Sequence, residues 1–212
     1  MISALDALAR LRDGNRRFVA NQLTAAATWK EARLATQSPQ DPFAIVLGCS
    51  DSRVPAELVF DQGFGDLFVI RVAGNVVAPS QVGSVEVAAS RFGTRLVVVV
   101  GHSQCGAVAA TLEELLGRSP ASSQNLRSIV DRVRPSVETL LSDGALKDPE
   151  ALLREAVRAN VRASVHHLRH GSDLLERFIS NDGLMVVGAE YSLESGLVTF
   201  FDGVDERGVA GG

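Results

Sequence analysis

Hydrophobic and polar positions along the chain follow two different periods. Short unbroken apolar runs, rich in β-branched residues, are typical of buried strands, whereas apolar residues three or four positions apart are typical of helices that lie on a core. Apolar runs predict strands at 43–47, 67–72, 96–100, 184–189 and 197–200. Because the first four runs are separated by helical segments, we expect right-handed crossovers and a mainly parallel sheet.

Helical spacing occurs between and before these runs. Near the start, Leu5, Leu8 and Leu11 recur with arginines between them, which predicts an amphipathic helix. Further helices are expected at 24–41 with a loop, at 54–60, 84–92 and 106–116, and over 125–170 with an interruption at 142–149. Gly196 before the last apolar run indicates a hairpin that adds an antiparallel edge strand.

The length of 212 residues suits one domain with a sizeable core. We therefore expect a single α/β domain over 1–212, with a helical arm and loop at 1–40, an α/β core at 41–200 and a C-terminal tail at 201–212. Its central sheet is expected to hold four parallel strands in the order 2-1-3-4 and the antiparallel edge strand, flanked by helices.

Charge excludes some classes of partner. The 21 basic and 25 acidic residues are mixed along the chain, so there is no basic stripe for nucleic acid. The amino terminus acquires charge too early for a signal peptide, and no apolar run approaches the length of a membrane span. We expect a cytoplasmic protein, in which two cysteines are thiols or metal ligands rather than a disulfide.

Both cysteines stand just after predicted strands. Cys49 follows the first strand, and His102 and Cys105 follow the third, so all three should meet at the carboxyl edge of the sheet. Two thiolates, one imidazole and a free fourth position describe a catalytic zinc site. A helix that starts after Cys105 would also favour its thiolate. The sequence thus predicts one zinc ion per chain.

Asp51 and Arg53 lie two and four residues beyond Cys49, so an extended segment places all three side chains on one side. An arginine can hold a carboxylate with two parallel hydrogen bonds. Held in this way, Asp51 could accept a hydrogen bond from a zinc-bound water molecule. Released from Arg53, Asp51 could instead ligate zinc and exclude water. The pair is therefore either a catalytic orienting device or an off switch.

The two motifs at 49–54 and 101–106 closely resemble those of the bacterial type of β-class carbonic anhydrase. Weaker matches at 13–18, 68–75 and 188–191 extend the resemblance over nearly the whole chain. The resemblance implies reversible hydration of carbon dioxide to bicarbonate and a proton, by attack of zinc-bound hydroxide on carbon dioxide in an apolar pocket.

The resemblance also implies roles for individual residues. Cys49, His102 and Cys105 correspond to the permanent zinc ligands of the family, and Asp51 to an occasional fourth ligand. Asp51 and Arg53 correspond to the dyad that orients or gates the metal-bound water.

Four residues match the substrate pocket of the family, namely Gln40, Val54, Phe68 and Val87, the last at a position where plant-like members carry a tyrosine. Members of the family form obligate homodimers, and whether dimers of this chain pair into a dimer of dimers is left open by the sequence. These dimers place pocket residues across the subunit interface, and the amino-terminal helix embraces the partner. The resemblance therefore predicts a homodimer with a somewhat wider pocket.

Other readings of the same residues are open. The zinc site could hydrolyse carbon disulfide or carbonyl sulfide, as in some relatives with this fold, or Asp51 could close the metal permanently in a silent assembly or sensor protein. Tyr191 matches one residue of a bicarbonate-inhibited site, but Val46 replaces its tryptophan, which argues against strong bicarbonate regulation. His166 and His170, one helical turn apart, lack an accompanying carboxylate or cysteine ligand and are expected to be solvated.

The ligand set predicts how activity depends on pH. Two thiolates and a neutral imidazole cancel the charge of a zinc dication, so a water molecule on that zinc loses its proton less readily than on a zinc held by three imidazoles. We expect the rate of carbon dioxide hydration, measured by stopped flow across pH, to rise on the alkaline side of neutral. A rate that stays flat from mildly acidic to alkaline pH would contradict this expectation.

Overall fold

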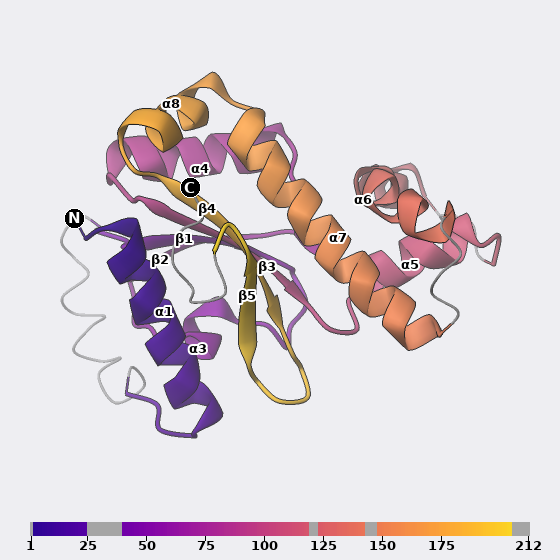
Figure 1. Cartoon of the computed structure of the whole chain (residues 1–212), viewed down its shortest axis with the longest axis horizontal. Helices are drawn as coiled ribbons and strands as arrows, with labels where there is room; N and C mark the ends of the chain where they lie inside the picture. The colour runs from indigo at the N-terminus through magenta and orange to yellow at the C-terminus, as the bar shows by residue number, and fades with distance from the viewer. Residues whose placement is uncertain (1, 25–39, 119–122, 143–147, 205–212) are drawn as a thin grey trace.

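A computed structural model describes residues 2–24, 40–118, 123–142 and 148–204. The helix expected within 24–41, the interruption at 142–149 and the C-terminal tail fall largely outside the described residues. The sheet has the strand order β2-β1-β3-β4-β5. Its strands are β1 (Ala44–Gly48), β2 (Leu67–Arg71), β3 (Leu96–His102), β4 (Met185–Tyr191) and β5 (Val198–Asp202). The first four are parallel and β5 is antiparallel to β4, so the predicted order and edge strand are confirmed (Figure 1).

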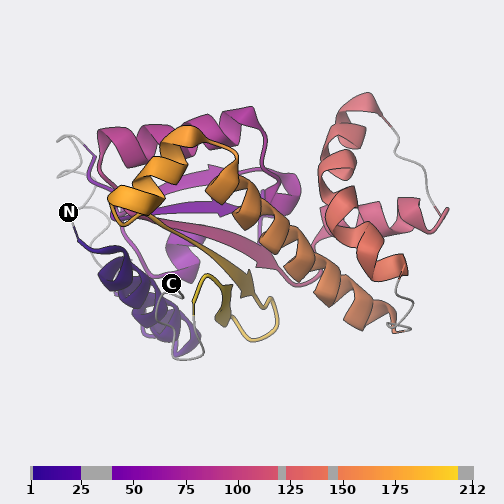
Figure 2. The same ribbon diagram turned by 45° about the horizontal axis from the view of Figure 1, so that its top comes forward.

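Helices cover both faces of this sheet (Figures 1 and 2). On one face lie α1 (Ala4–Val19) and the short α3 (Ala56–Val59), and on the other lie α4 (Pro79–Arg91), α7 (Pro149–His170) and α8 (Asp173–Asn181). Every residue of β1 and β3 is buried, because both sit in the middle of a sheet covered on two sides. This burial explains why both strands are unbroken apolar runs rather than alternating patterns.

A third group of helices lies beyond the carboxyl edge of the sheet. It consists of α5 (Gly106–Leu115), α6 (Gln124–Ser142) and the first turns of α7, which pack on a separate hydrophobic cluster (Figure 2). That cluster includes both cysteines. The short 3-10 turn η2 (Ala73–Asn75) also contacts α5, α6 and α7. This edge of the sheet is therefore enclosed by helices.

The largest differences from the predicted helices concern α4 and α8. Helix α4 begins at Pro79 rather than at 84, because the fixed φ of proline suits the first helical position. Helix α8 had no counterpart among the predicted elements. It begins after Ser172, whose hydroxyl accepts a hydrogen bond from the Leu175 amide as an N-cap.

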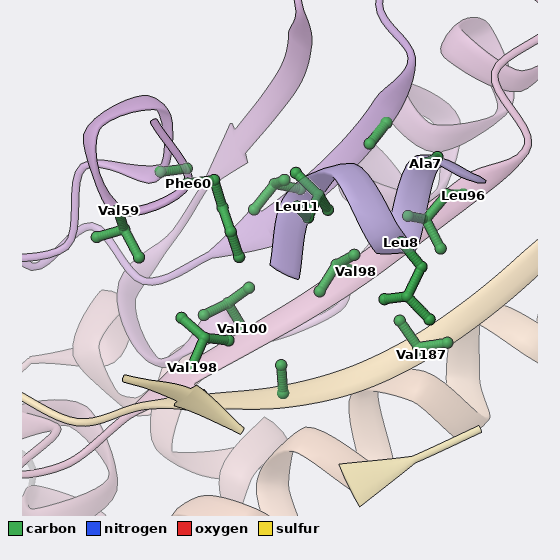
Figure 3. Packing of buried hydrophobic residues seen from close by; sticks show 14 of the residues in the cluster. Ala7, Leu8, Leu11, Val59, Phe60, Leu96, Val98, Val100, Val187 and Val198 are labelled. Carbon is green, nitrogen blue, oxygen red and sulfur yellow. The ribbon is translucent and has the colours of Figure 1, made fainter. Parts of the chain in front are cut away.

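Helix α1 packs against the sheet of its own chain. Leu8 and Leu11 are fully buried beside Val98 and Val187, with Phe60 completing this part of the core (Figure 3). The embrace of a partner subunit by this helix stays a prediction. None of the described helices is both long and apolar enough to cross a bilayer.

A buried asparagine ties α1 to two other elements. The Asn15 amide nitrogen donates to the carbonyl oxygens of Val59 and Gly196, at 3.1 and 2.9 Å, and its Oδ1 accepts from the Val198 amide at 2.9 Å. Asn15 is only 2% exposed. These bonds join α1 to α3 and to the hairpin between β4 and β5.

Gly14 lets α1 lie close to the backbone at the end of α3. A Cβ atom at Gly14 would overlap the carbonyl oxygen of Phe60, whereas a Cβ at Gly83 in α4 would have open space around it. We expect Gly14→Ala to lower the free energy of unfolding by about 1–3 kcal/mol, through overpacking. Gly83→Ala, the matched control, should raise it by about 0.5–1 kcal/mol. Urea denaturation measures both, and equal effects at the two positions would refute the contact.

Candidate metal centre

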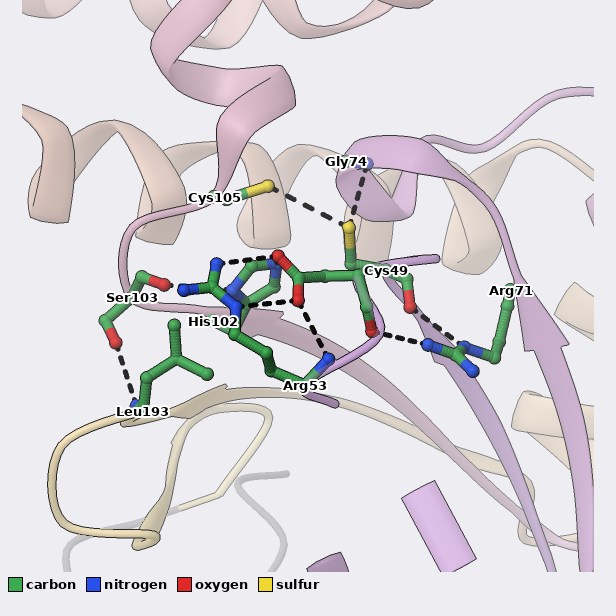
Figure 4. A network of polar contacts seen from close by, with 9 residues as sticks. Cys49, Arg53, Arg71, Gly74, His102, Ser103, Cys105 and Leu193 are labelled. Atoms are coloured by element: carbon green, nitrogen blue, oxygen red, sulfur yellow. Dashed lines mark hydrogen bonds and ion pairs between the residues drawn. The ribbon is translucent and has the colours of Figure 1, made fainter. Parts of the chain in front are cut away.

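Three potential metal ligands meet at the carboxyl edge of the sheet. Cys49 directly follows β1, His102 is the last residue of β3, and Cys105 is the N-cap residue of α5. All three are buried, and their ligand atoms lie within 4.8 Å of one another. The two sulfur atoms are 4.0 Å apart (Figure 4). The structure thus brings together the three side chains that the sequence analysis expected to converge.

The imidazole of His102 is oriented by the backbone. Its Nδ1 lies 2.9 Å from the carbonyl oxygen of Ser103, and because a carbonyl only accepts, Nδ1 carries the proton and donates. The other nitrogen, Nε2, therefore offers a lone pair. Nε2 is buried and has no hydrogen-bond partner among the described residues. A ligand-ready nitrogen without a partner is what a metal site requires.

The donor set fits a metal ion in both distance and chemistry. Sulfur atoms bound at 2.3 Å to a tetrahedral zinc ion are separated by about 3.8 Å, close to the spacing of the two cysteine sulfurs. Thiolate and imidazole donors suit zinc and related transition metals better than magnesium or calcium. Within the described ranges, no other three potential ligands come this close together.

A hydrogen bond couples the two thiols. The hydrogen bond to Cys105 lowers the pKa of Cys49 well below its ordinary value, and the same bond, together with burial, raises the pKa of Cys105. Burial lowers the pKa of His102, but the Cys49 thiolate, the Ser103 carbonyl and the Asp51 carboxylate together outweigh burial and raise this pKa. The cluster thus stabilises negative charge, and a cation would take the place of the hydrogen-bonded proton.

Two backbone features support the thiolates. The Gly74 amide donates to the Cys49 sulfur at 3.4 Å (Figure 4). Cys105 sits at the amino terminus of α5, where unpaired amide groups and the helix dipole favour a negative charge. The amides of Ala107 and Val108 act to lower the pKa of Cys105, against the larger opposing effects.

Asp51 and Arg53 form the predicted pair at the rim of the cluster. Arg53 donates from Nε and a terminal nitrogen to the two carboxylate oxygens of Asp51, at 2.9 and 2.8 Å, and its amide donates to Oδ1 at 2.9 Å. These bonds hold the pKa of Asp51 well below its usual range, so the carboxylate is ionised at neutral pH. Its Oδ2 lies 3.9 Å from His102 Nε2.

Arg71 fixes the loop that carries this pair, and the sequence analysis did not identify it. Its Nε donates to the Cys49 carbonyl oxygen at 3.1 Å, and a terminal nitrogen donates to the Asp51 carbonyl oxygen at 2.5 Å (Figure 4). Arg71 ends β2 and is paired in register with Gly48. The only signal in the sequence is its place at the end of a strand that neighbours β1.

The predicted pocket residues lie in different places. Val54 is buried, and together with Cys49 it lines a small apolar cavity of about 10 Å³. Gln40 is exposed and precedes β1, whereas Cys49 follows it, so the five residues of the strand, about 16 Å at 3.3 Å per residue, separate them. Phe68 pairs in register with Ile45 near the start of β1.

Phe68 and Val87 have other surroundings in the structure. The Phe68 ring packs against Phe92, with 6.1 Å between ring centroids. Val87 lies on α4 and is 44% exposed. Within one chain the structure therefore joins Cys49, His102, Cys105 and the Asp51–Arg53 pair, and leaves Gln40, Phe68 and Val87 apart from them.

Comparisons with known proteins agree on one family. A family model described as carbonic anhydrase matches residues 44–198. Carbonic anhydrase 2 of Mycobacterium tuberculosis is 36% identical over 199 residues, which cover 93% of each chain. The carbonic anhydrase of Mycolicibacterium smegmatis is 38% identical over 188 residues, 89% of this chain and 88% of the relative.

Solved structures show the same fold. The β-carbonic anhydrase CafA of Aspergillus fumigatus superposes with a TM-score of 0.74 at 26% identity, covering 86% of this chain and 88% of that one. The β-carbonic anhydrase CcaA gives a TM-score of 0.73 at 25% identity, covering 98% and 93%. The chain therefore belongs to the β-class carbonic anhydrase family.

Proposed function

We propose that this protein is a zinc-dependent carbonic anhydrase, which reversibly hydrates carbon dioxide to bicarbonate and a proton. The observation that carries the proposal is the buried cluster of two thiols and an imidazole whose Nε2 lacks a partner among the described residues. Cys49, His102 and Cys105 would hold one zinc ion per chain. When bound, zinc supplies a Lewis acid that lowers the pKa of a water molecule and so makes it a better nucleophile.

Asp51 has the charge and position to orient the reacting water. Arg53 donates two hydrogen bonds to Oδ1 and one to Oδ2, so Oδ2 keeps a further lone pair that can accept a hydrogen bond. At 3.9 Å from His102 Nε2, Oδ2 lies beside the ligand cluster. An acceptor fixed at this point directs the lone pair of the water oxygen toward carbon dioxide, which lowers the entropy cost of the reaction.

The same distance argues against a permanently closed site. With both carboxylate oxygens bonded to Arg53, Asp51 is held at the rim rather than among the ligand atoms. A silent zinc protein closed by Asp51 would need this pair to be broken. Gating by release of Asp51 stays a proposal for other conditions.

We propose that the substrate pocket is completed by a second copy of the chain. Val54 contributes an apolar wall next to Cys49, which suits a substrate with no net dipole. Gln40 and Phe68 lie about a strand length from the cluster of their own chain, and Val87 is exposed on α4. In a homodimer they would serve the partner's cluster. Two β-carbonic anhydrases of Sordaria macrospora with this fold are tetrameric, and a dimer of dimers is our proposal here.

We propose a cytoplasmic location for the enzyme. Both cysteines of the ligand cluster are free thiols, and a reducing compartment would keep them available to the metal.

A stopped-flow assay of carbon dioxide hydration, combined with elemental analysis, tests the activity. We expect zinc in the purified parent protein and a rate above buffer. Cys105→Ala should lose both zinc and activity, whereas Asp51→Ala should keep zinc and lose activity by about 10²-fold, because it removes orientation only. Asp13→Ala, which breaks the exposed Asp13–Arg16 pair on α1, is the matched control and should keep the parental rate.

A zinc-loaded parent protein that hydrates carbon dioxide no faster than buffer at neutral and alkaline pH would refute the proposed activity. Parallel assays with carbon disulfide and carbonyl sulfide then decide whether the same site serves a hydrolase.

Mixing of two inactive variants tests the shared pocket. A chain with Gln40→Ala keeps its ligands, and a chain with Cys105→Ala keeps Gln40, so a mixed dimer restores one complete site. After unfolding and joint refolding, we expect roughly a quarter of the parental activity, because half of the dimers are mixed and each has one complete site. Recovery no greater than that of the two variants refolded separately would show that Gln40 does not act across an interface.

A further inference from the structure

Two buried polar side chains connect helix α7 to the turn beside the metal centre. Asn160 and Ser164 lie one helical turn apart, and they are 2% and 5% exposed. The Asn160 amide nitrogen donates to the Gly74 carbonyl oxygen at 2.7 Å, and the Ser164 hydroxyl donates to the Asn75 carbonyl oxygen at 3.0 Å. Neither residue touches the ligand cluster directly in these bonds, but both hold the turn next to it.

The turn at Ala73–Asn75 needs this support. Gly74 has φ +65° and Asn75 has φ +44°, so two successive residues lie in the left-handed region. Asparagine tolerates that region better than most residues but still prefers others. The hydrogen bonds from α7 bind the carbonyl oxygens of these same two residues. They therefore stabilise the conformation in which the Gly74 amide points at the Cys49 sulfur.

Two glycines in the sheet allow α7 to come this close. A Cβ atom at Gly101 of β3 would lie 2.6 Å from a methyl carbon of Val161, and a Cβ at Gly188 of β4 would lie 2.9 Å from the other. Val161 follows Asn160 on α7. The missing side chains thus let the helix settle on the sheet, where Asn160 meets the turn.

We infer that Asn160 is a positioning residue for the metal centre. Its hydrogen bond holds Gly74 so that the Gly74 amide fixes the orientation of the Cys49 thiolate. The inference rests on the proposed function, since it gives Cys49 the role of a metal ligand. A hydrogen bond to a ligating sulfur fixes the direction of its lone pairs and withdraws electron density from it. Partners of this kind typically account for a 10- to 100-fold part of metal affinity.

Zinc affinity of the Asn160→Ala protein, measured by competition with a chromogenic chelator, is the first test. We expect binding about tenfold weaker than in the parent protein. The matched control is Asn15→Ala, which removes another 2%-exposed asparagine that donates to backbone carbonyls far from the cluster. This control should lower the melting temperature and leave zinc affinity at the parental value.

The cobalt-substituted protein gives a signature that a merely structural residue would not change. Loss of the Gly74 hydrogen bond raises the energy of the sulfur electrons, so the thiolate-to-cobalt absorption band of Asn160→Ala should move to longer wavelength. Ser164→Ala, which loosens the same turn at Asn75, should move the band in the same direction by less. Asn15→Ala should leave the band in place.

Unchanged zinc affinity and an unchanged cobalt band in folded Asn160→Ala would overturn the inference, as would equal losses in Asn15→Ala. If Asn160→Ala does not fold, Ser164→Ala decides the question by the same two measurements. A parent protein that binds no zinc refutes the proposed function itself. A parent that binds zinc and is active, beside variants with parental metal binding, refutes only the role of Asn160.

Discussion

The parallel pairing of β1 with β3 is the constraint on which the site depends. Gly48 pairs with Val100, so Cys49 emerges beside the last residues of β3, where His102 lies. A shift of one residue would turn every side chain of a strand to the opposite face. Both strands are buried along their whole length, and a shifted register would have to repack both faces of the sheet. Hydrophobic packing far from the cluster therefore determines the distance between its ligand atoms.

The cluster concentrates negative charge in a buried place, and the surrounding backbone compensates it in part. The amino terminus of α5 supports Cys105, the Gly74 amide supports Cys49, and Arg53 neutralises Asp51. Arg71 bonds the carbonyl oxygens of the same loop, which keeps Cys49 and Asp51 in place. His102 Nε2 is left as an acceptor without a donor among the described residues. A bound dication would balance the remaining charge and would bind the unpaired nitrogen.

The sequence was sufficient to predict the sheet and the convergence of Cys49, His102 and Cys105 at its edge. It was insufficient to predict the groups that hold these side chains in place. Unbroken apolar runs indicate central strands, and cysteine or histidine just after two such runs indicates a shared edge. Asn160 gave no signal, because a polar residue in an amphipathic helix is normally solvated and its partner is a backbone carbonyl 86 residues away. Arg71 likewise donates to backbone carbonyl oxygens among the described residues. Because the partners are backbone atoms, no pair of residue types in the sequence indicates either contact. Helix α8 was missed because it is short and buries mainly Leu175.

The length of β1 decides which functions one chain can perform alone. Ligands can be collected from several strands because parallel strands end at one edge, but residues at the opposite edge stay a strand length away. Gln40 and Phe68 are of this second kind. A two-fold axis can bring the opposite edge of one copy to the ligand edge of another. The same interface then completes the equivalent site of the second copy. Under the proposed function, one subunit would supply the metal ligands, and a second copy of the chain would complete the substrate pocket.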